Sequence, residues 1–259
     1  MSIIKIKILS KTNEKCRFLL EDVTPDFANA LRRIMISEVP TLAIEYVDFI
    51  ENTSALFDEI IAHRLGMIPL EFDPKKFNFA EECKCKGKGC SLCEVVFVVN
   101  KKGPGVVYSG DLKSSNKDVK PTSPNFPIVE LLEGHIVKFE AVARLGIGKN
   151  HIKWQAANAS YQYLPELKES GENPKRAVSI CPKGALELKG DKLVFKDPYA
   201  CDLCKMCEIA GVKIEGNKTK FIFSVETVSG LKPEYIISKS AEIIQEKAKE
   251  FKRELSKIK

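Results

Sequence analysis

Hydrophobic side chains recur at intervals of three and four residues in one stretch near the start of the chain, the spacing that gives a helix a single apolar face. Thr24 can cap this helix, Pro25 suits its first position, and Pro40 limits its length. The residues of the apolar face are Phe27, Ala30, Leu31 and Ile34. The pattern predicts a helix of about four turns from Pro25 with one face to bury.

A second and narrower hydrophobic stripe follows Pro233. Its members are spaced alternately four and three residues apart, and Lys and Glu fill most positions between them. They are Ile237, Ala241, Ile244, Ala248, Phe251, Leu255 and Ile258. Such a seam on a helix of about seven turns exceeds the needs of one small core, so it favours contact with another chain. An ordinary core helix is the alternative.

Alternation of apolar and polar residues predicts strands in several places. The first two make a hairpin that leads into the first helix. A strand also follows Pro40, and after it comes a shorter helix that Asn52 or Ser54 can cap. The other predicted strands contain Val95–Asn100, Ile128–Leu132 and His135–Leu145, and the polar stretch Ser109–Pro127 is expected to be an exposed loop.

Composition narrows the classes of function. With 259 residues and 44% hydrophobic content, the chain is long enough for two domains or one with insertions. The net charge is +6, but Lys and Glu are interleaved and no aromatic-rich basic stripe stands out, which argues against an autonomous nucleic-acid binder. No secretory signal or membrane-spanning apolar run is present, so we expect a cytoplasmic protein that does not contact membranes.

Four of the nine cysteines have the spacing of an iron-sulfur site. Cys201, Cys204 and Cys207 form the C-x2-C-x2-C run of bacterial ferredoxins, and Cys181 with the following Pro182 supplies the closing Cys-Pro pair. A second cluster would need cysteines at Gly171, Pro174, Ala177 and Gly211. The sequence therefore predicts one 4Fe-4S cluster, or 3Fe-4S after loss of a ligand or an iron in air. Zinc in the same four thiolates and two disulfides are the alternatives.

The runs around these cysteines indicate a ferredoxin-like insertion with short strands at Ala177–Ile180, Ala185–Leu188 and Lys192–Phe195. Between Gly171 and Glu215 there are eight basic and seven acidic residues, a net charge of only +1. No acidic field is available to steer the cluster to a reductase. We interpret the cluster as structural, because ligand bonds can replace a missing core. A redox-sensing or electron-transfer protein is the rival interpretation.

A second cysteine group lies in the Gly- and Lys-rich loop before Val95. Cys83, Cys85, Cys90 and Cys93 fall within eleven residues and end in a C-x2-C half-site typical of zinc. Three lysines between them would offset the charge of a four-thiolate site. Zinc is the favoured metal ion for these four thiols, and disulfides remain the alternative.

The segment LRRIMISEVPTLAIEYVDFIENTSALFDEIIAHRLGMIPL, which ends at Leu70, resembles the signature of the D-type subunits of archaeal DNA-directed RNA polymerase. That family is the counterpart of the third-largest subunit of eukaryotic RNA polymerase II and of the bacterial alpha subunit's N-terminal domain. GIGKNHIKW at Gly146–Trp154 and FIFSVETVSGLKPEYII at Phe221–Ile237 resemble the family in the same order. Eukaryotic members carry a similar zinc loop, so the resemblance also implies zinc at Cys83–Cys93.

The resemblance implies an α+β fold in three parts. These are a discontinuous dimerisation domain at 1–50 plus 221–259, an inserted mainly-β domain at 51–165 with the Cys-rich loop, and a ferredoxin-like iron-sulfur insertion at 166–220. The chain would pair with the small alpha-like subunit L and support assembly of the large catalytic subunits and of the small subunits N and P. The expected pairing residues are Phe27, Leu31, Ile34, Ile237, Ile244, Phe251 and Leu255.

No residues for catalysis are evident. The three histidines are not near a candidate nucleophile, and no run of carboxylates resembles the magnesium-binding aspartates of polymerases. We therefore expect a subunit of a nucleotidyltransferase that does no chemistry itself and meets DNA only through the assembled polymerase.

Overall fold

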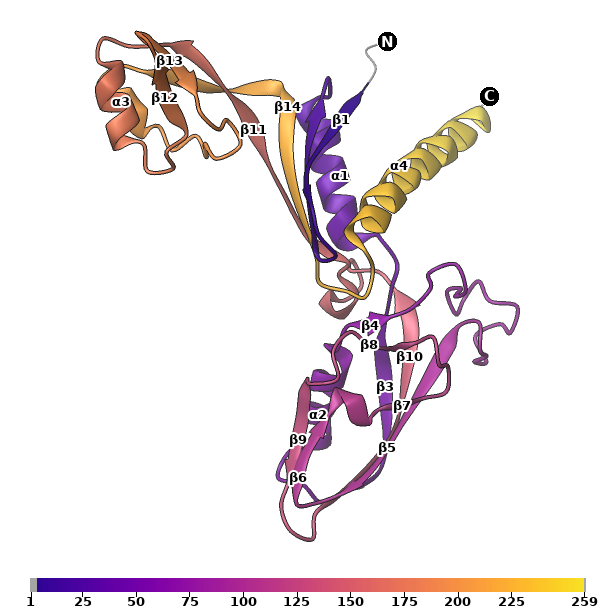
Figure 1. The fold of residues 1–259 in the computed structure, drawn as a ribbon. Helices are drawn as coiled ribbons and strands as arrows, with labels where there is room; N and C mark the ends of the chain where they lie inside the picture. Colours follow the sequence, from indigo (N-terminus) through magenta and orange to yellow (C-terminus); the bar gives the residue numbers. More distant parts are fainter. Residues whose placement is uncertain (1–3, 259) are drawn as a thin grey trace. The chain divides into compact units, whose positions relative to one another are not determined.

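The protein is described by a computed structural model covering residues 4–258, a mixed fold made mostly of sheets (Figure 1). The chain forms two compact units. Unit 1 contains the chain up to Arg32 together with Ala159–Val225, and unit 2 contains Arg33–Asn158 together with the chain from Glu226. Each unit is therefore discontinuous in sequence. The three-part division expected from the sequence stays a prediction.

A four-stranded sheet organises unit 1. Its strands are β1 (Lys5–Lys11), β2 (Lys15–Glu21), β14 (Lys213–Thr227) and β11 (Ala157–Glu169), in that order across the sheet. The predicted hairpin is confirmed as β1 and β2, and Cys16 is buried as expected. Phe18 stacks on Phe223 with ring centroids 5.0 Å apart, so strands from both ends of the sequence share one aromatic core.

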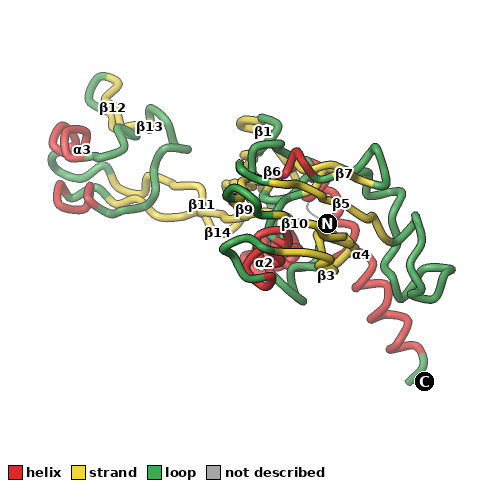
Figure 2. Tube along the Cα trace, turned by 90° about the horizontal axis from the view of Figure 1, so that it is seen from below, coloured by secondary structure: helices red, strands yellow, loops and turns green. Residues whose placement is uncertain are grey.

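A small part of unit 1 lies beyond the ends of β11 and β14, which run to it side by side (Figures 1 and 2). It contains α3 (Pro174–Ile180), β12 (Leu186–Lys189), β13 (Lys192–Phe195) and the 3-10 turn η3 (Met206–Ala210). The two later strands were predicted, but the strand expected at Ala177–Ile180 was wrong. Asn173 Oδ1 accepts the backbone N–H of Arg176, and Pro174 takes the first helical position, so the segment begins a helix instead.

The main sheet of unit 2 has the order β3 (Thr41–Asn52), β10 (Ile136–Gly146), β5 (Glu94–Lys102), β7 (Lys113–Ser114). Two small sheets pair β4 (Leu70–Glu71) with β8 (Lys120–Pro121) and β6 (Gly105–Tyr108) with β9 (Pro127–Leu131). Short 3-10 turns are η1 (Ser109–Asp111) and η2 (Ile152–Trp154). Helix α2 (Asp58–Gly66) buries Ile61 and Leu65. The fully buried Phe97 and Phe139 lie on neighbouring strands of the main sheet.

Two local expectations for unit 2 were wrong. Neither Asn52 nor Ser54 caps α2, whose N-cap is Phe57 without a side-chain hydrogen bond. Ser54 Oγ donates to Asn52 Oδ1 at 2.6 Å and Asn52 Nδ2 donates to Asp58 Oδ1 at 2.7 Å, so both residues stabilise the preceding turn. The stretch Ser109–Pro127 is not simply an exposed loop, because Ser109 is fully buried and donates to the carbonyl of Ser123 at 2.6 Å.

Both long amphipathic helices begin where the sequence predicts. Helix α1 (Pro25–Ser37) follows Thr24, whose Oγ1 accepts the N–H of Phe27 at 3.4 Å, and α4 runs from Pro233 to Ser256. The first half of α4 buries Ile236 and Ser240, and Lys247 Nζ donates to Glu38 Oε1 at 2.6 Å. From Gln245 to the last described residue, every side chain is exposed. The second half of the helix thus contributes nothing to the core of its unit.

The turn η1 is held by an ion pair whose contribution depends on pH. Lys101 Nζ and the N–H of Tyr108 donate to Asp111 Oδ2 at 2.6 and 2.8 Å. Burial opposes the charge, but these hydrogen bonds hold the pKa of Asp111 below its ordinary value of 3.8. Because the pKa of Asp111 is lower in the folded protein than the value of about 3.9 in the unfolded chain, its ionised carboxylate stabilises the fold at pH values above 3.9. This stabilisation is lost as the pH falls through the folded-state pKa.

We therefore expect Asp111→Asn to lower the free energy of unfolding by about 1 kcal/mol at neutral pH, since both side chains are about one-third exposed. Urea denaturation at neutral pH and at about pH 3 should show a smaller difference between variant and wild type in acid. A difference of the same size at both pH values would show that the carboxylate is not responsible.

Candidate metal centres

The loop before β5 brings four thiols into one group. The Sγ atoms of Cys83, Cys85, Cys90 and Cys93 all lie within 4.8 Å of one another. The Cys83–Cys90 and Cys85–Cys93 sulfur atoms are 3.5 Å apart, and those of Cys90 and Cys93 are 3.7 Å apart. These distances exceed a disulfide bond length of about 2.05 Å, so the four side chains are free thiols gathered around one point. The group could hold a metal ion.

The thiols have unequal acidities. Burial opposes ionisation of Cys85, but hydrogen bonds from the other three thiols, that of Cys93 foremost, lower its pKa to about 6. Burial raises the pKa of Cys93 to about 12. The thiolate is the metal-binding form, and the loop therefore already favours one such ligand at neutral pH.

An ion pair fastens this loop to the main sheet of unit 2. Glu94 follows Cys93 directly, its N–H donates to the carbonyl of Cys90 at 2.9 Å, and its carboxylate accepts Arg144 Nε at 2.6 Å. Arg144 lies on β10 opposite Glu94 and above the ring of Tyr46. Burial opposes the charge of Arg144, but Glu94, with smaller contributions from Tyr46 and Cys93, raises its pKa. The guanidinium thus supplies positive charge beside the thiol group.

Replacement of Arg144 by Met is expected to destabilise unit 2 by about 2 kcal/mol, because the largely buried Glu94 carboxylate loses its partner. A metal ion bound by the four thiols should also be released faster, which a chromogenic chelator can follow after thermal stability is measured. Lys120→Met is the matched control, since Lys120 and Glu71 form an exposed pair. Equal stability and equal release in the two variants would exclude an anchoring role for Arg144.

Four of the other five cysteines surround a pocket in the small part of unit 1. Cys181 follows α3, Cys201 and Cys204 come from the segment that leads into η3, and Cys207 lies within η3. All four line one hollow. Pro182, Lys183, Leu186, Asp202, Leu203, Lys205, Met206 and Ile214 complete the lining. The structure thus brings together residues up to 26 positions apart in sequence, as the spacing predicted.

Backbone geometry orients these cysteines. Leu203 and Lys205 take left-handed conformations, with φ of 58° and 64°, on either side of Cys204. Such conformations are uncommon for residues with a Cβ atom and cluster at functional sites. The N–H of Ala185 also donates to Cys181 Sγ at 3.4 Å. Hydrogen bonds of this kind to cysteine sulfur tune the reduction potential of iron-sulfur clusters.

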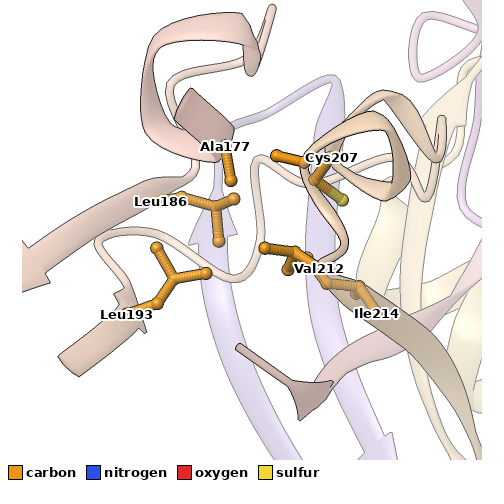
Figure 3. Close-up of a cluster of buried hydrophobic side chains, with 7 residues drawn as sticks. Ala177, Leu186, Leu193, Cys207, Val212 and Ile214 are labelled. Atoms are coloured by element: carbon orange, nitrogen blue, oxygen red, sulfur yellow. The ribbon is translucent and has the colours of Figure 1, made fainter. Parts of the chain in front are cut away.

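The hydrophobic core beside this pocket is small. Its buried members are Ala177, Leu186, Leu193, Cys207, Ala210, Val212 and Ile214. In Figure 3 the side chains of α3 and the β12–β13 hairpin face those of the chain around Cys207, with no aromatic ring among them. One pocket cysteine is therefore also a core residue, so ligand loss at Cys207 would disturb the packing directly.

Exposure differs among the four pocket cysteines. Cys207 is buried, Cys181 and Cys201 are half-buried, and Cys204 is exposed. Burial is the first cause that raises the pKa of Cys201 and of Cys207, and nearby thiols add to it. Without positive charge, these two side chains favour the neutral thiol. A cationic centre in the pocket would stabilise their thiolate forms.

The expected pairing residues on α1 and α4 differ in their exposure to solvent. On α1, Leu31 and Ile34 are only 5% and 7% exposed, while Phe27 is half-buried. On α4, Ile237 and Ile244 are half-buried, whereas Phe251 is 67% exposed and Leu255 is also exposed. These residues remain a predicted interface, and most of its accessible apolar area is on the second half of α4.

Sequence reasoning did not identify Arg144 as part of the first centre. The only local hint was Glu94, directly after Cys93, and its partner Arg144 lies 50 residues further along the chain. Only the pairing of β5 with β10 brings the two together. Among residues 4–258, no helix has the length and apolar character needed to cross a lipid bilayer.

Comparison with known proteins places this fold in a class. Residues 47–165 match the family model described as the RNA polymerase Rpb3/RpoA insert domain. The chain therefore carries the insert domain named after the Rpb3 and RpoA polymerase subunits.

Relatives along the whole chain identify the family. The chain is 40% identical to DNA-directed RNA polymerase subunit Rpo3 of Thermococcus kodakarensis, covering 98% of this chain and 99% of the relative. It is 38% identical to the protein of that name from Archaeoglobus fulgidus over 98% of each, and 37% identical to that from Methanosarcina acetivorans over 96% and 97%. The chain belongs to the Rpo3 family of DNA-directed RNA polymerase subunits, and it therefore assembles with other polymerase subunits.

Proposed function

We propose that the chain is a non-catalytic assembly platform of an archaeal, cytoplasmic RNA polymerase. It pairs with the small alpha-like subunit L and then receives the large catalytic subunits and the small subunits N and P. The exposed second half of α4 carries this proposal, because its apolar seam has no covering element in unit 2 as far as the structure describes it (Figure 1). A long helix with an uncovered apolar stripe is stable when a partner buries it.

The pocket in unit 1 is the proposed site of one 4Fe-4S cluster bound by Cys181, Cys201, Cys204 and Cys207 within a ferredoxin-like fold. The lining of one hollow by all four cysteines and the left-handed turns beside Cys204 support this assignment. Within residues 4–258, only the Cys83 group has its ligand atoms all within 4.8 Å of one another. The proposed role of the cluster is structural, since the adjoining core is small.

The Cys83–Cys93 loop is the proposed zinc site. In a tetrahedral site with Zn–S bonds of about 2.3 Å, neighbouring sulfur atoms lie about 3.8 Å apart. Three of the six separations are 3.5 to 3.7 Å, close to this value. Arg144 and the loop lysines would offset the negative charge of the thiolates. Arg144 already pairs with the negative charge of Glu94.

Co-expression with the small partner subunit, followed by size-exclusion chromatography and metal analysis under exclusion of air, tests the proposal. We expect a complex of one copy of each subunit with about four irons and one zinc per copy of this chain. A chain that remains monomeric beside the partner argues against the platform. Zinc in both sites would exclude the iron-sulfur assignment and leave the platform standing.

The exposure of Cys204 favours one second function, redox sensing, because solvent and oxidants reach that ligand first. Potentiometry with EPR on the purified complex separates the two roles. A reversible couple that changes transcription by the assembled polymerase supports sensing, and an irreversible loss of iron with unchanged transcription by the remaining holoprotein supports a structural cluster.

A further inference from the structure

The four thiols in the loop before β5 fall into two pairs by distance. Cys83 Sγ lies 3.5 Å from Cys90 Sγ, and Cys85 Sγ lies 3.5 Å from Cys93 Sγ. Because each thiol belongs to one of these pairs, both pairs can form a bond at the same time. A disulfide bond of about 2.05 Å needs an approach of about 1.5 Å within each pair. Bonding of Cys90 to Cys93 starts from 3.7 Å and leaves Cys83 to bond with Cys85 across a single residue.

Exposure to solvent divides both pairs in the same way. Cys83 and Cys93 are only 5% and 0% exposed, and we call them the buried thiols. Cys85 and Cys90 are half-buried, and we call them the accessible thiols. Each pair therefore joins one accessible thiol to one buried thiol. In cysteine oxidation an accessible sulfur reacts first, and a neighbouring resolving cysteine then forms the disulfide. Each pair thus contains one sulfur for each of these two steps.

Tight turns between the cysteines bring the pairs together. The N–H of Lys86 donates to the carbonyl of Cys83 at 2.8 Å. Lys86, Gly87 and Gly89 take left-handed conformations, with φ of 54°, 78° and 87°. These reversals return the chain from Cys83 to Cys90 within seven positions. A Cβ atom at Gly87 would meet its nearest non-neighbouring atom at 3.9 Å, so the turn has space to shift. The short sulfur movement that a disulfide needs therefore meets little obstruction here.

We propose that this loop is an oxidation site, at which a peroxide converts the four thiolates into Cys83–Cys90 and Cys85–Cys93 disulfides and releases the metal ion. The inference rests on the proposed zinc site and adds a reversible modification to it. In each pair the accessible thiolate attacks one oxygen of hydrogen peroxide, the O–O bond breaks, hydroxide leaves, and the sulfur becomes a sulfenic acid. The buried thiolate then attacks that sulfur, the S–O bond breaks, and a second hydroxide leaves as the S–S bond forms.

The stoichiometry of this oxidation links disulfide formation to metal release. Two molecules of peroxide accept four electrons from the four thiolates and give two disulfides and four hydroxide ions. The thiolate is the form of cysteine that binds metal, so a loop with both disulfides has no remaining thiolate ligand. A dithiol reductant reverses both bonds by thiol–disulfide exchange and restores the four ligands. The site therefore records exposure to peroxide and recovers when reductant returns.

The first test titrates the full chain, purified with its small partner subunit without air, with hydrogen peroxide. Elemental analysis after desalting measures the zinc that stays with the protein. We expect zinc content to fall about tenfold, and to return after treatment with dithiothreitol and zinc. A chain without zinc before the titration would contradict the proposed zinc site, and the disulfide pairing below would still decide the inference. Zinc that stays bound while both disulfides form would overturn the proposed release.

Peptide mapping of the oxidised chain measures the disulfide pairing independently of zinc. Trypsin and chymotrypsin together cut between all four cysteines after the remaining thiols are alkylated. The cleavage points are Lys84, Lys86, Lys88 and Leu92. We expect the peptide of Cys83 joined to that of Cys90, and the peptide of Cys85 joined to that of Cys93. The buried Cys16 is the control and should remain a thiol. Any other pairing, or oxidation without disulfides, would overturn the inference.

Two double variants test the separate roles of the accessible and buried thiols. Cys83→Ser with Cys93→Ser keeps the accessible thiols, whereas Cys85→Ser with Cys90→Ser keeps the buried ones. Dimedone, a reagent for sulfenic acid, should label the first variant at least about tenfold faster during exposure to peroxide. Each variant lacks two of the four thiols, so any loosening of the loop affects both. Equal labelling rates would show that exposure does not select the sulfur that reacts first.

Discussion

Replacement of Cys207 by Ser is expected to abolish stable iron binding and to unfold the small part of unit 1. Cys207 is both a pocket thiol and a buried member of the adjoining aliphatic core, so its loss removes a ligand and places a hydroxyl among apolar side chains. We expect iron content to fall roughly tenfold or more, because cluster binding and local folding are coupled. Iron analysis and limited proteolysis between α3 and η3 provide the measurements.

Cys204→Ser is the informative companion variant. Cys204 is exposed and outside the core, so this variant should keep the local fold and retain a three-iron cluster that EPR can detect. Cys16→Ser is a control for thiol loss away from either centre. A Cys207→Ser protein that lacks iron but resists protease as the wild type does would disprove the structural role of the cluster.

Replacement of Phe251 by Glu is expected to release the small partner subunit. The ring is 67% exposed in this chain, and a buried aromatic side chain removes about 150 to 250 Å² from water. At about 25 cal/mol per Å², losing most of that burial and introducing a charge should weaken pairing by about 3 kcal/mol or more, roughly a hundredfold in Kd. Co-purification and an affinity titration measure the effect.

Lys249→Glu is the matched control for that experiment. It introduces the same side chain into the same exposed half of α4, but at a position outside the heptad seam. Pairing should weaken little in this control. Co-purification of the partner with the Phe251→Glu chain at wild-type yield would remove α4 from the interface.

Several elements could be predicted because their signals are local. The cap and proline at Thr24 and Pro25 set the start of α1, Pro233 sets the start of α4, and alternation sets the β1–β2 hairpin. The cysteine spacings likewise identified two groups of four, and each group lies together in the structure. These patterns depend on residues a few positions apart, which a sequence displays directly.

The failures occurred where distant or competing contacts decide. Asn52 and Ser54 have good capping side chains, but they bond to each other and to Asp58, so α2 starts with the apolar Phe57 instead. At Ala177–Ile180 a β-branched pair suggested a strand, whereas the cap at Asn173 produces a helix. The burial of the face with Leu31 and Ile34 was predicted, but the element that covers it was not, since periodicity identifies an apolar face without naming what packs on it.

The course of β11 and β14 has a practical consequence. The chain leaves the main sheet of unit 1 along β11, builds the whole cysteine pocket, and comes back along β14, its hydrogen-bonded neighbour in that sheet. The two points of attachment are therefore adjacent, and the intervening stretch behaves as an exchangeable module. Replacing the stretch between β11 and β14 by a short turn would yield a variant that lacks the pocket but keeps the strand order of the sheet. Such a variant makes it possible to ask what the remainder of the chain does when no cluster has to be built.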